Sequence, residues 1–256
     1  MTALATLLAE ARPAGDGFVA TIPETWLQGR TAYGGLSAAL ALHAALGLAD
    51  DLPPLRSAQV SFIGPLAGEV TVEPLLLRRG RNAAFIQADV RSDAGLGLRA
   101  TFVFMAQIAS TIARDAASRA PVPIPPADAA LYVGPDTFFT GNFEFYDVKE
   151  GLGPAEWLRW ARLRHRDGLH PMVEMMAIGD ALPPAAFKLL SEPRPLSSLT
   201  WILNLTTPAP RTDDGWWLLR ANSDHARDGY SSQSMRIWNA AGDPVGEGMQ
   251  GVAIFG

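Results

Sequence analysis

The chain has 256 residues, no cysteine, 48% hydrophobic residues and a formal net charge of −5. This length fits one large domain or two domains of about 100–130 residues, and the hydrophobic content excludes a disordered chain. The absence of cysteine excludes disulfides, thiolate metal sites and a cysteine nucleophile. The acidic charge and the lack of a basic stripe argue against a nucleic-acid partner.

The first 18 residues have no basic segment before their apolar part, so they do not read as a secretory signal. No apolar run approaches the roughly 20 residues that a membrane-spanning helix needs. We therefore expect a cytoplasmic protein with no membrane partner.

The first half of the chain predicts one strand, one helix and four further strands. Residues 18–23 alternate like a strand, and residues 34–49 form a helix-like stretch that is apolar on nearly every face. Residues 57–66 alternate again. Residues 68–105 read as three long strands, with turn signals at Gly-Arg-Asn and Ser-Asp-Ala-Gly.

A connector with five prolines, residues 120–138, divides the chain nearly in half. After it, residues 143–148 and 157–166 read as strands. A helix begins at Pro171 and must end before Pro183-Pro184. Four strands complete the chain, one over 197–208 and three over 216–255. The second half therefore repeats the order of the first, which indicates an internal duplication.

A helix that is apolar all round must be enclosed, and a curved antiparallel sheet around one central helix does this. The sequence thus predicts an α+β double hotdog, in which two antiparallel sheets each wrap a long central helix. Pairing of the two copies edge to edge would make one continuous sheet and remove an open edge. The expected parts are an N-terminal hotdog (1–112), a proline-rich connector (113–138) and a C-terminal hotdog (139–256).

Asp180 is unusual because it lies near the C-terminus of an apolar helix, where the helix dipole disfavours a negative charge. Both the apolar surroundings and the helix end should raise the pKa of its carboxyl, which suits a general base. The first helix carries no carboxylate over residues 35–49, so one competent acid is expected. The ordinary alternative is a cap or turn acid before the two prolines.

Several short motifs together resemble one family, the type II acyl-CoA thioesterases, whose chains are double hotdogs. The likeness covers residues 18–255 and rests on AYGGLSAALAL (32–42), the strand-turn-strand run 57–90, GDALPP (179–184), SSLTWILNLTTP (197–208) and GDPVGEGMQGVAIF (242–255). It implies hydrolysis of an acyl-CoA thioester in fatty acid metabolism, without a cofactor or metal, by a chain that assembles into a homodimer.

The resemblance also implies a site in which an aspartate, a hydroxyl and a glutamine surround a nucleophilic water. Asp180 matches the aspartate and Gln250 the glutamine. Counted back from Pro208, Ser198 falls on the hydroxyl position and Thr200 lies two residues further on. Residues two apart in a strand face the same way, so either hydroxyl could act. The ordinary alternatives are structural hydroxyls and an outward-facing Gln250.

Two helix starts could bind the oxyanion of a hydrolytic intermediate, because the first amides of a helix have no partner within it. Gly34 and Gly35 open the first helix and permit close approach of a substrate. The start of the second helix, near His170, competes with them. The sequence leaves this choice open.

Three other functions compete with base-assisted hydrolysis. A serine hydrolase is disfavoured because no Gly-x-Ser-x-Gly motif occurs. An enoyl-CoA hydratase on the same fold would carry a histidine shortly after Asp180, where the chain reads Ala-Leu-Pro-Pro-Ala-Ala-Phe-Lys. A non-catalytic protein that binds acyl chains or CoA remains the rival from another class. No histidine spacing typical of a metal site occurs.

Overall fold

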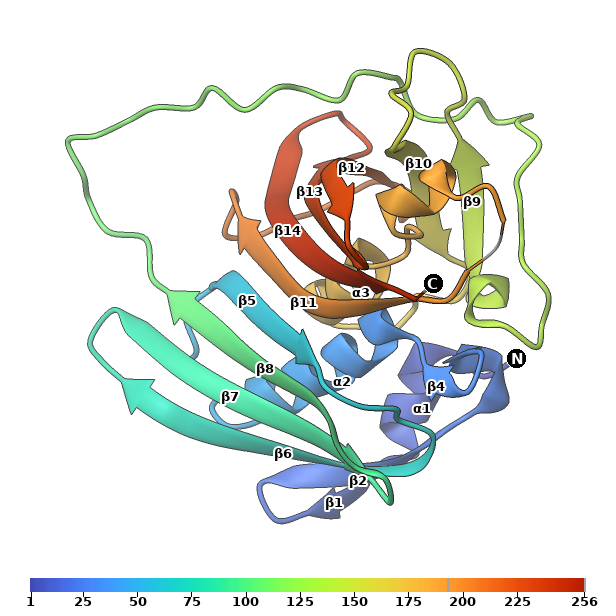
Figure 1. Cartoon of the computed structure of the whole chain (residues 1–256). Coiled ribbons are helices and arrows are strands. Elements are labelled where there is room, and N and C mark those ends of the chain that lie inside the picture. Colours follow the sequence, from blue (N-terminus) through green and yellow to red (C-terminus); the bar gives the residue numbers. More distant parts are fainter. Residues whose placement is uncertain (193, 256) are drawn as a thin grey trace.

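The computed structural model describes residues 1–192 and 194–255. Its main feature is a single antiparallel sheet of 12 strands with two helices, α2 and α3, on one face (Figure 1). The helices are α1 (Leu4–Ala9), α2 (Gly34–Leu46) and α3 (Pro171–Gly179). Three short 3₁₀ helices, η1 (Glu24–Trp26), η2 (Phe139–Asn142) and η3 (Ala185–Leu189), lie in the connections. None of the helices in the described residues is long and apolar enough to cross a membrane.

The strands of the first half are β1 (Arg12–Ala14), β2 (Gly17–Ile22), β5 (Leu55–Phe62), β6 (Gly68–Arg79), β7 (Ala83–Ser92) and β8 (Gly95–Met105). Those of the second half are β9 (Phe143–Asp147), β10 (Glu156–Leu163), β11 (Leu196–Leu205), β12 (Trp217–Arg227), β13 (Tyr230–Asn239) and β14 (Pro244–Ile254). A separate small ribbon pairs β3 (Leu27–Gln28) with β4 (Thr31–Ala32).

The strand order is the same in both halves when each is read towards the middle of the sheet. The first half runs β2-β6-β7-β8-β5, and the second runs β10-β12-β13-β14-β11. The two inner strands, β5 and β11, pair antiparallel over five residues, from Ser57 opposite Asn204 to Ser61 opposite Thr200. This pairing joins the two halves into one sheet.

The two predicted sheets, which were expected to pair edge to edge, form one continuous sheet, and the expectation that both central helices are long is corrected. The sheet is continuous, because the β5–β11 pairing leaves no open edge between the halves. The second helix has only nine residues. It begins with Pro171 at its first turn and is capped at Asp180, and the prolines that follow cannot continue a helix.

The helices are buried because both are built from small and apolar residues. All α2 residues from Gly35 to Leu42 are buried, and α3 buries every residue from Met175 to Gly179. The alanines of α2 allow it to pack closely against α3 and against β6, β7 and β8. These two helices and the inner face of the sheet form the main core.

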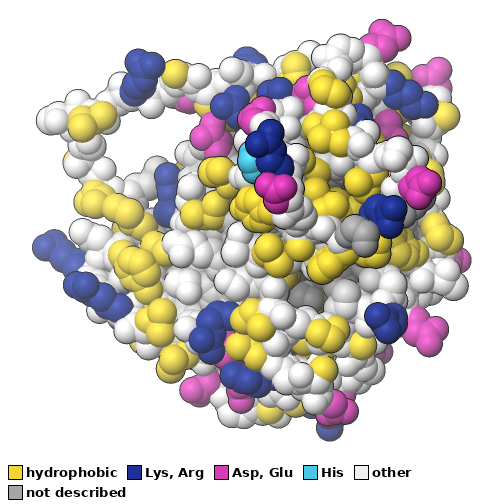
Figure 2. Space-filling model, viewed as in Figure 1, with side chains coloured by type: hydrophobic (Ala, Val, Ile, Leu, Met, Phe, Trp, Pro, Cys, Tyr) yellow, Lys and Arg dark blue, Asp and Glu magenta, His cyan; other side chains and the backbone are white. Residues whose placement is uncertain are grey.

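The connector lies between Met105 and Phe139 and contains no helix or strand. Its first part stands away from the body (Figure 2), and residues 107–116 are all exposed. Its later part covers the outer face of β10, β12 and β13, where Trp238 Nε1 donates to Ser118 O at 2.7 Å and Ala120 packs on the second core cluster. The division at residues 112 and 138 stays a prediction.

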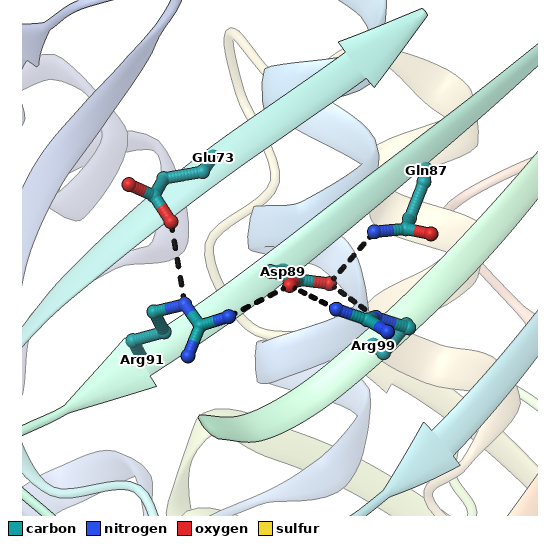
Figure 3. A network of polar contacts seen from close by, with 5 residues as sticks. All are labelled: Glu73, Gln87, Asp89, Arg91 and Arg99. Carbon is teal, nitrogen blue, oxygen red and sulfur yellow. Dashed lines mark hydrogen bonds and ion pairs between the residues drawn. The ribbon is translucent and has the colours of Figure 1, made fainter. Parts of the chain in front are cut away.

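The outer face of β6, β7 and β8 carries a polar network centred on Asp89, which is only 6% exposed (Figure 3). Arg99 donates to its two carboxylate oxygens at 2.7 and 2.6 Å, Arg91 donates at 3.1 Å and Gln87 at 3.2 Å. The hydrogen bond from Arg99 lowers the pKa of Asp89, although burial opposes this.

We expect Asp89→Asn to lower the free energy of unfolding by about 1–2 kcal/mol at pH 7, because the arginines lose a charged acceptor but remain partly solvated. The lowered pKa stabilises the fold above the unfolded pKa of about 3.9, and this contribution disappears as pH falls through the folded pKa. Urea unfolding of both proteins would measure the difference. Asp93→Asn, at an exposed turn position, is the matched control. Equal stabilities of Asp89→Asn and wild type at pH 7 would contradict this role.

Candidate active site

Asp180 lies where the end of α3 meets the start of α2. It forms the C-terminal cap of α3, with φ −101° and ψ 11°. Its carboxylate also accepts a hydrogen bond from the backbone N–H of Gly35. A Cβ atom on Gly34 would stand 2.5 Å from Asp180 Oδ2, so only glycine allows this approach. The dipole of α3 disfavours a negative charge at its C-terminal end, but the same carboxylate lies at the N-terminal, positive end of the α2 dipole.

Tyr33 fixes the relative position of the two helices at this site. It is the N-cap of α2, and its hydroxyl donates to Ala177 O, near the end of α3, at 2.8 Å. Its ring stacks on Phe139, with ring centroids 4.2 Å apart. Tyr33 is 1% exposed. A carbonyl without a partner in its helix is thus satisfied by the residue that starts the neighbouring helix.

The carboxyl of Asp180 has a strongly raised pKa. Burial raises it to about 7, while the hydrogen bonds donated by Gln250 and Gly35 act in the opposite direction. The side chain keeps partial exposure, so a proton can be exchanged. A carboxyl with this pKa is ionised in a large fraction of molecules near neutral pH and still basic enough to take a proton.

Gln250 lies on the inner face of β14 and is 3% exposed. Its Nε2 donates to Asp180 Oδ1 at 2.8 Å. Its Oε1 accepts from Gln233 Nε2 at 2.6 Å, and Gln233 Oε1 accepts from the backbone N–H of Ala185 at 2.7 Å. The structure thus brings Asp180 and Gln250 together, and adds Gln233 from the neighbouring strand.

The two candidate hydroxyls do not share a face of β11, so that expectation is wrong. A bulge at Leu199 shifts the register: Ser198 lies opposite Val252, whereas Thr200 lies opposite Gly251. Val252 is fully buried, so Ser198 belongs to the inner face. Thr200 is exposed and lines a shallow hollow on the outer face with Ser61 and Met249. Thr200 therefore faces away from Asp180.

Trp201 lies directly opposite Gln250, at the inner-face position of β11 nearest to that side chain. Its ring lies against Gly179, whose Cβ position is 3.1 Å from Trp201 Cη2 and Cζ2. The residue is 1% exposed, and its Nε1 has no hydrogen-bond partner among the described residues. Within the residues that the structure describes, Ser198 makes no hydrogen bond to Asp180 or Gln250.

The rival helix start, at α3, is already capped by a side chain. His170 Nδ1 accepts from the backbone N–H of Met172 at 3.2 Å. At the start of α2, in contrast, the N-cap residue Tyr33 makes no side-chain cap, and the carboxylate of Asp180 accepts a hydrogen bond from the Gly35 amide instead. Across the described residues, no three histidine, aspartate or glutamate side chains are grouped to hold a metal.

Sequence reasoning missed Gln233 and Trp201, and it placed Tyr33 at the helix start without giving its side chain a role. Gln233 and Trp201 flank Gln250 across the sheet, one on β13 and one on β11. A signal for Gln233 was present, because it falls on the inward positions of an alternating strand with Met235 and Ile237. Tyr33 directly precedes the paired glycines, but nothing in the sequence shows its contact with Ala177.

Two family models together cover most of the chain. The model for the acyl-CoA thioesterase N-terminal domain matches residues 22–105, and that for the acyl-CoA thioesterase C-terminal domain matches residues 115–254. No curated protein matches the sequence at a significant level.

Solved structures of the hotdog fold resemble the whole chain. A conserved protein of unknown function with a hotdog fold from Alicyclobacillus acidocaldarius has a TM-score of 0.83 and 20% identity, covering 100% of this chain and 99% of its own. The tesB protein of Mycobacterium avium subs paratuberculosis has a TM-score of 0.78 and 21% identity, covering 99% and 100%. An acyl-CoA thioesterase II of Mycobacterium marinum has a TM-score of 0.75 and 16% identity, covering 99% and 97%.

At these identities the structural likeness establishes the fold, and the two matching domain models, in the expected order along the sequence, establish the family. The chain belongs to the acyl-CoA thioesterase family.

Proposed function

We propose that this protein hydrolyses acyl-CoA thioesters, with Asp180 as the general base. The observation that carries the proposal is a carboxyl with a pKa of about 7, held by Gln250 at the start of α2. Membership of the acyl-CoA thioesterase family gives the substrate class. The geometry supports Asp180 as the residue that activates water.

In the proposed reaction, Asp180 takes a proton from a water molecule while the water oxygen attacks the thioester carbon. The carbonyl oxygen becomes an oxyanion, which the electropositive start of α2 at Gly34 stabilises. The intermediate then collapses, the carbon–sulfur bond breaks, and the proton passes from Asp180 to the departing CoA sulfur. The products are a free acid and CoA.

The remaining groups orient these reactants without changing charge. Gln250 holds one carboxylate oxygen of Asp180 and leaves the other at Gly34, where the water would be placed. The Gly35 amide is taken by Asp180, so Gly34 is the better oxyanion candidate of the two. Ser198 shares the inner face and is the hydroxyl that we propose for binding water; Thr200 is not part of this proposal.

The direct test is release of free CoA from acyl-CoAs of short, medium and long chains, followed with a thiol reagent at pH 8. We expect steady turnover with at least one chain length. Because the chain contains no cysteine, the reagent detects only the product thiol. Binding of acyl-CoAs without turnover at any length would refute the enzyme proposal.

A non-catalytic acyl-CoA-binding protein is the second candidate, and one observation favours it. Trp201, not a hydroxyl residue, lies directly beside Gln250 on the inner face of β11. A site that lacks a water-binding hydroxyl would bind substrate but hydrolyse it slowly. The expected homodimer and cytoplasmic location also remain proposals. Leu75, Leu76 and Leu77 are exposed on β6 and directly precede the exposed Arg78 and Arg79, and such an apolar stretch suits a surface for self-association.

Gly34→Ala is expected to lower hydrolysis by about 10- to 100-fold, because small displacements of reacting groups carry costs of this size. The new Cβ would stand 2.5 Å from Asp180 Oδ2 and 2.8 Å from Phe62 Cε1, so the carboxylate must move. Steady-state rates of CoA release measure the effect. Gly47→Ala, just after the same helix, is the matched control, since its Cβ would meet nothing nearer than 3.4 Å. Wild-type rates for Gly34→Ala would remove Gly34 from the site.

A further inference from the structure

Gln233 and Gln250 form a buried chain of hydrogen bonds that ends on Asp180. The two residues are directly opposite each other on β13 and β14 and are 1% and 3% exposed. The chain runs from Ala185 N to Gln233 Oε1 at 2.7 Å, from Gln233 Nε2 to Gln250 Oε1 at 2.6 Å, and from Gln250 Nε2 to Asp180 Oδ1 at 2.8 Å.

The direction of this chain is fixed at its far end. A side-chain amide has one oxygen that accepts and one NH₂ group that donates, and either can face a neighbour after a flip. The backbone N–H of Ala185 can only donate, so it selects the oxygen of Gln233. The NH₂ group of Gln233 then selects the oxygen of Gln250, and the NH₂ group of Gln250 is left for Asp180.

Ala185 can supply the first donor of this hydrogen-bond chain, because its backbone N–H needs an acceptor outside its own helix. It is the first residue of η3, directly after Pro183-Pro184, and the first amides of a helix have no acceptor within it. The residue is fully buried, so Gln233 supplies an acceptor that water cannot. The prolines that end α3 therefore also position the donor that orients both glutamines.

We propose that Gln233 is a positioning residue, which acts through Gln250 to keep an N–H donor directed at the carboxylate of Asp180. This inference rests on the proposed function only for its effect on hydrolysis. The orientation itself is a property of the fold and can be measured without substrate. Without Gln233, the Gln250 amide could turn its oxygen towards Asp180, which would favour the protonated acid.

Other groups around Asp180 do not supply this control. The start of α2 contributes the Gly35 amide and the Cα of Gly34, and β5 contributes the ring of Phe62. Tyr33 is the titratable neighbour, and the pKa of its phenol is raised by burial and by the charge of Asp180. Its hydroxyl is already bonded to Ala177 O. Within residues 1–192 and 194–255, no charged side chain contributes to the shifted pKa of Asp180.

The test is a double-mutant cycle read from the ionisation of Asp180. Selective ¹³C labelling of aspartate carboxyls, with Asp180→Asn to assign the signal, gives the titration midpoint of Asp180 by NMR. Gln233→Met keeps the side-chain volume but can neither accept from Ala185 nor donate to Gln250. We expect it to raise the midpoint by about 0.5–1 pH unit, as weakening of a hydrogen bond to the charged form requires. Gln250→Met should raise it by more.

If Gln233 acts through Gln250, then Gln233→Met produces no further shift in the Gln250→Met background. An unchanged midpoint in Gln233→Met, or a full additional shift in the double variant, would overturn the proposal. Gln87→Met, on β7 and hydrogen-bonded to Asp89, controls for the loss of a partly buried glutamine elsewhere.

A second variant covers the case in which Gln233→Met does not fold. Gln233→Glu keeps an acceptor for Ala185 but, when ionised, offers Gln250 only an acceptor, so the Gln250 amide must reverse. The midpoint of Asp180 should then rise further than in Gln233→Met, and most of the rise should vanish when Gln250 is Met. A rise that persists undiminished in the Gln250→Met background would show direct charge repulsion and would refute positioning. Failure of wild type to hydrolyse any acyl-CoA would refute the proposed function but leave these midpoints measurable.

Discussion

Asp180→Asn is expected to lower kcat for acyl-CoA hydrolysis by about 10²- to 10⁴-fold, the range that a general base typically contributes. The substitution removes the group that accepts the proton of the attacking water. The contact with Gln250 can persist, because the asparagine Oδ1 can still accept from Gln250 Nε2, as Asp180 does at 2.8 Å. The asparagine NH₂ group cannot replace the second carboxylate oxygen as an acceptor at the start of α2. The Michaelis constant should therefore change much less than kcat.

The measurement is steady-state release of CoA at pH 8 from the best substrate of the chain-length panel. Asp16→Asn, at an exposed turn position between β1 and β2, is the matched control and should keep wild-type rates. Binding of a non-hydrolysable acyl-CoA analogue to Asp180→Asn should be retained. If this variant hydrolyses acyl-CoA within threefold of wild type, Asp180 is not the base.

Much of the fold followed from the sequence because alternation and turn residues are local signals. The Ser-Asp-Ala-Gly turn signal is one example: it lies between β7 and β8, and Gly95 there adopts a positive φ of 102°. The predicted order of strand, helix and four strands holds in each half, whereas the pairing of β5 with β11 depends on contacts distant in sequence. The second helix is shorter than the long central helix that was expected, because it ends at Gly179, before Pro183 requires it to.

Some residues of the candidate site could likewise be predicted from local sequence, and others depend on contacts distant in sequence. Asp180 was identifiable because a carboxylate at the end of an apolar helix conflicts with its local surroundings, and such conflicts mark functional positions. The unfavourable charge is compensated by the start of α2, where Gly35 lies 145 residues earlier in the sequence than Asp180. The faces of Ser198 and Thr200 could not be assigned, because one extra residue at Leu199 reverses the alternation and no sequence signal marks this bulge.

The raised pKa of Asp180 also predicts a stability that falls as pH rises. Its carboxyl titrates at about 7 in the folded state, against about 3.9 when unfolded. Between these values the folded state binds more protons, so the free energy of unfolding decreases with pH. The stability contribution is fully present below pH 4 and is lost as pH rises through 7. The full shift corresponds to about 4 kcal/mol, and partial exposure of the side chain reduces the expected loss to about 2–4 kcal/mol.

Urea unfolding of wild type and Asp180→Asn at pH 4.5 to 8.5 would measure this effect, because all other titrating groups, including Asp89, cancel in the difference. The asparagine variant should gain stability relative to wild type across this range, with the gain complete above pH 8. The same ionisation should control kcat/KM of wild type, which is expected to rise tenfold per pH unit below pH 7 and to level off above it. A stability difference that is flat with pH would show that Asp180 titrates normally. Coinciding midpoints in the two measurements would identify the buried carboxyl as the group that limits hydrolysis, since unfolding involves no substrate and turnover involves no unfolding.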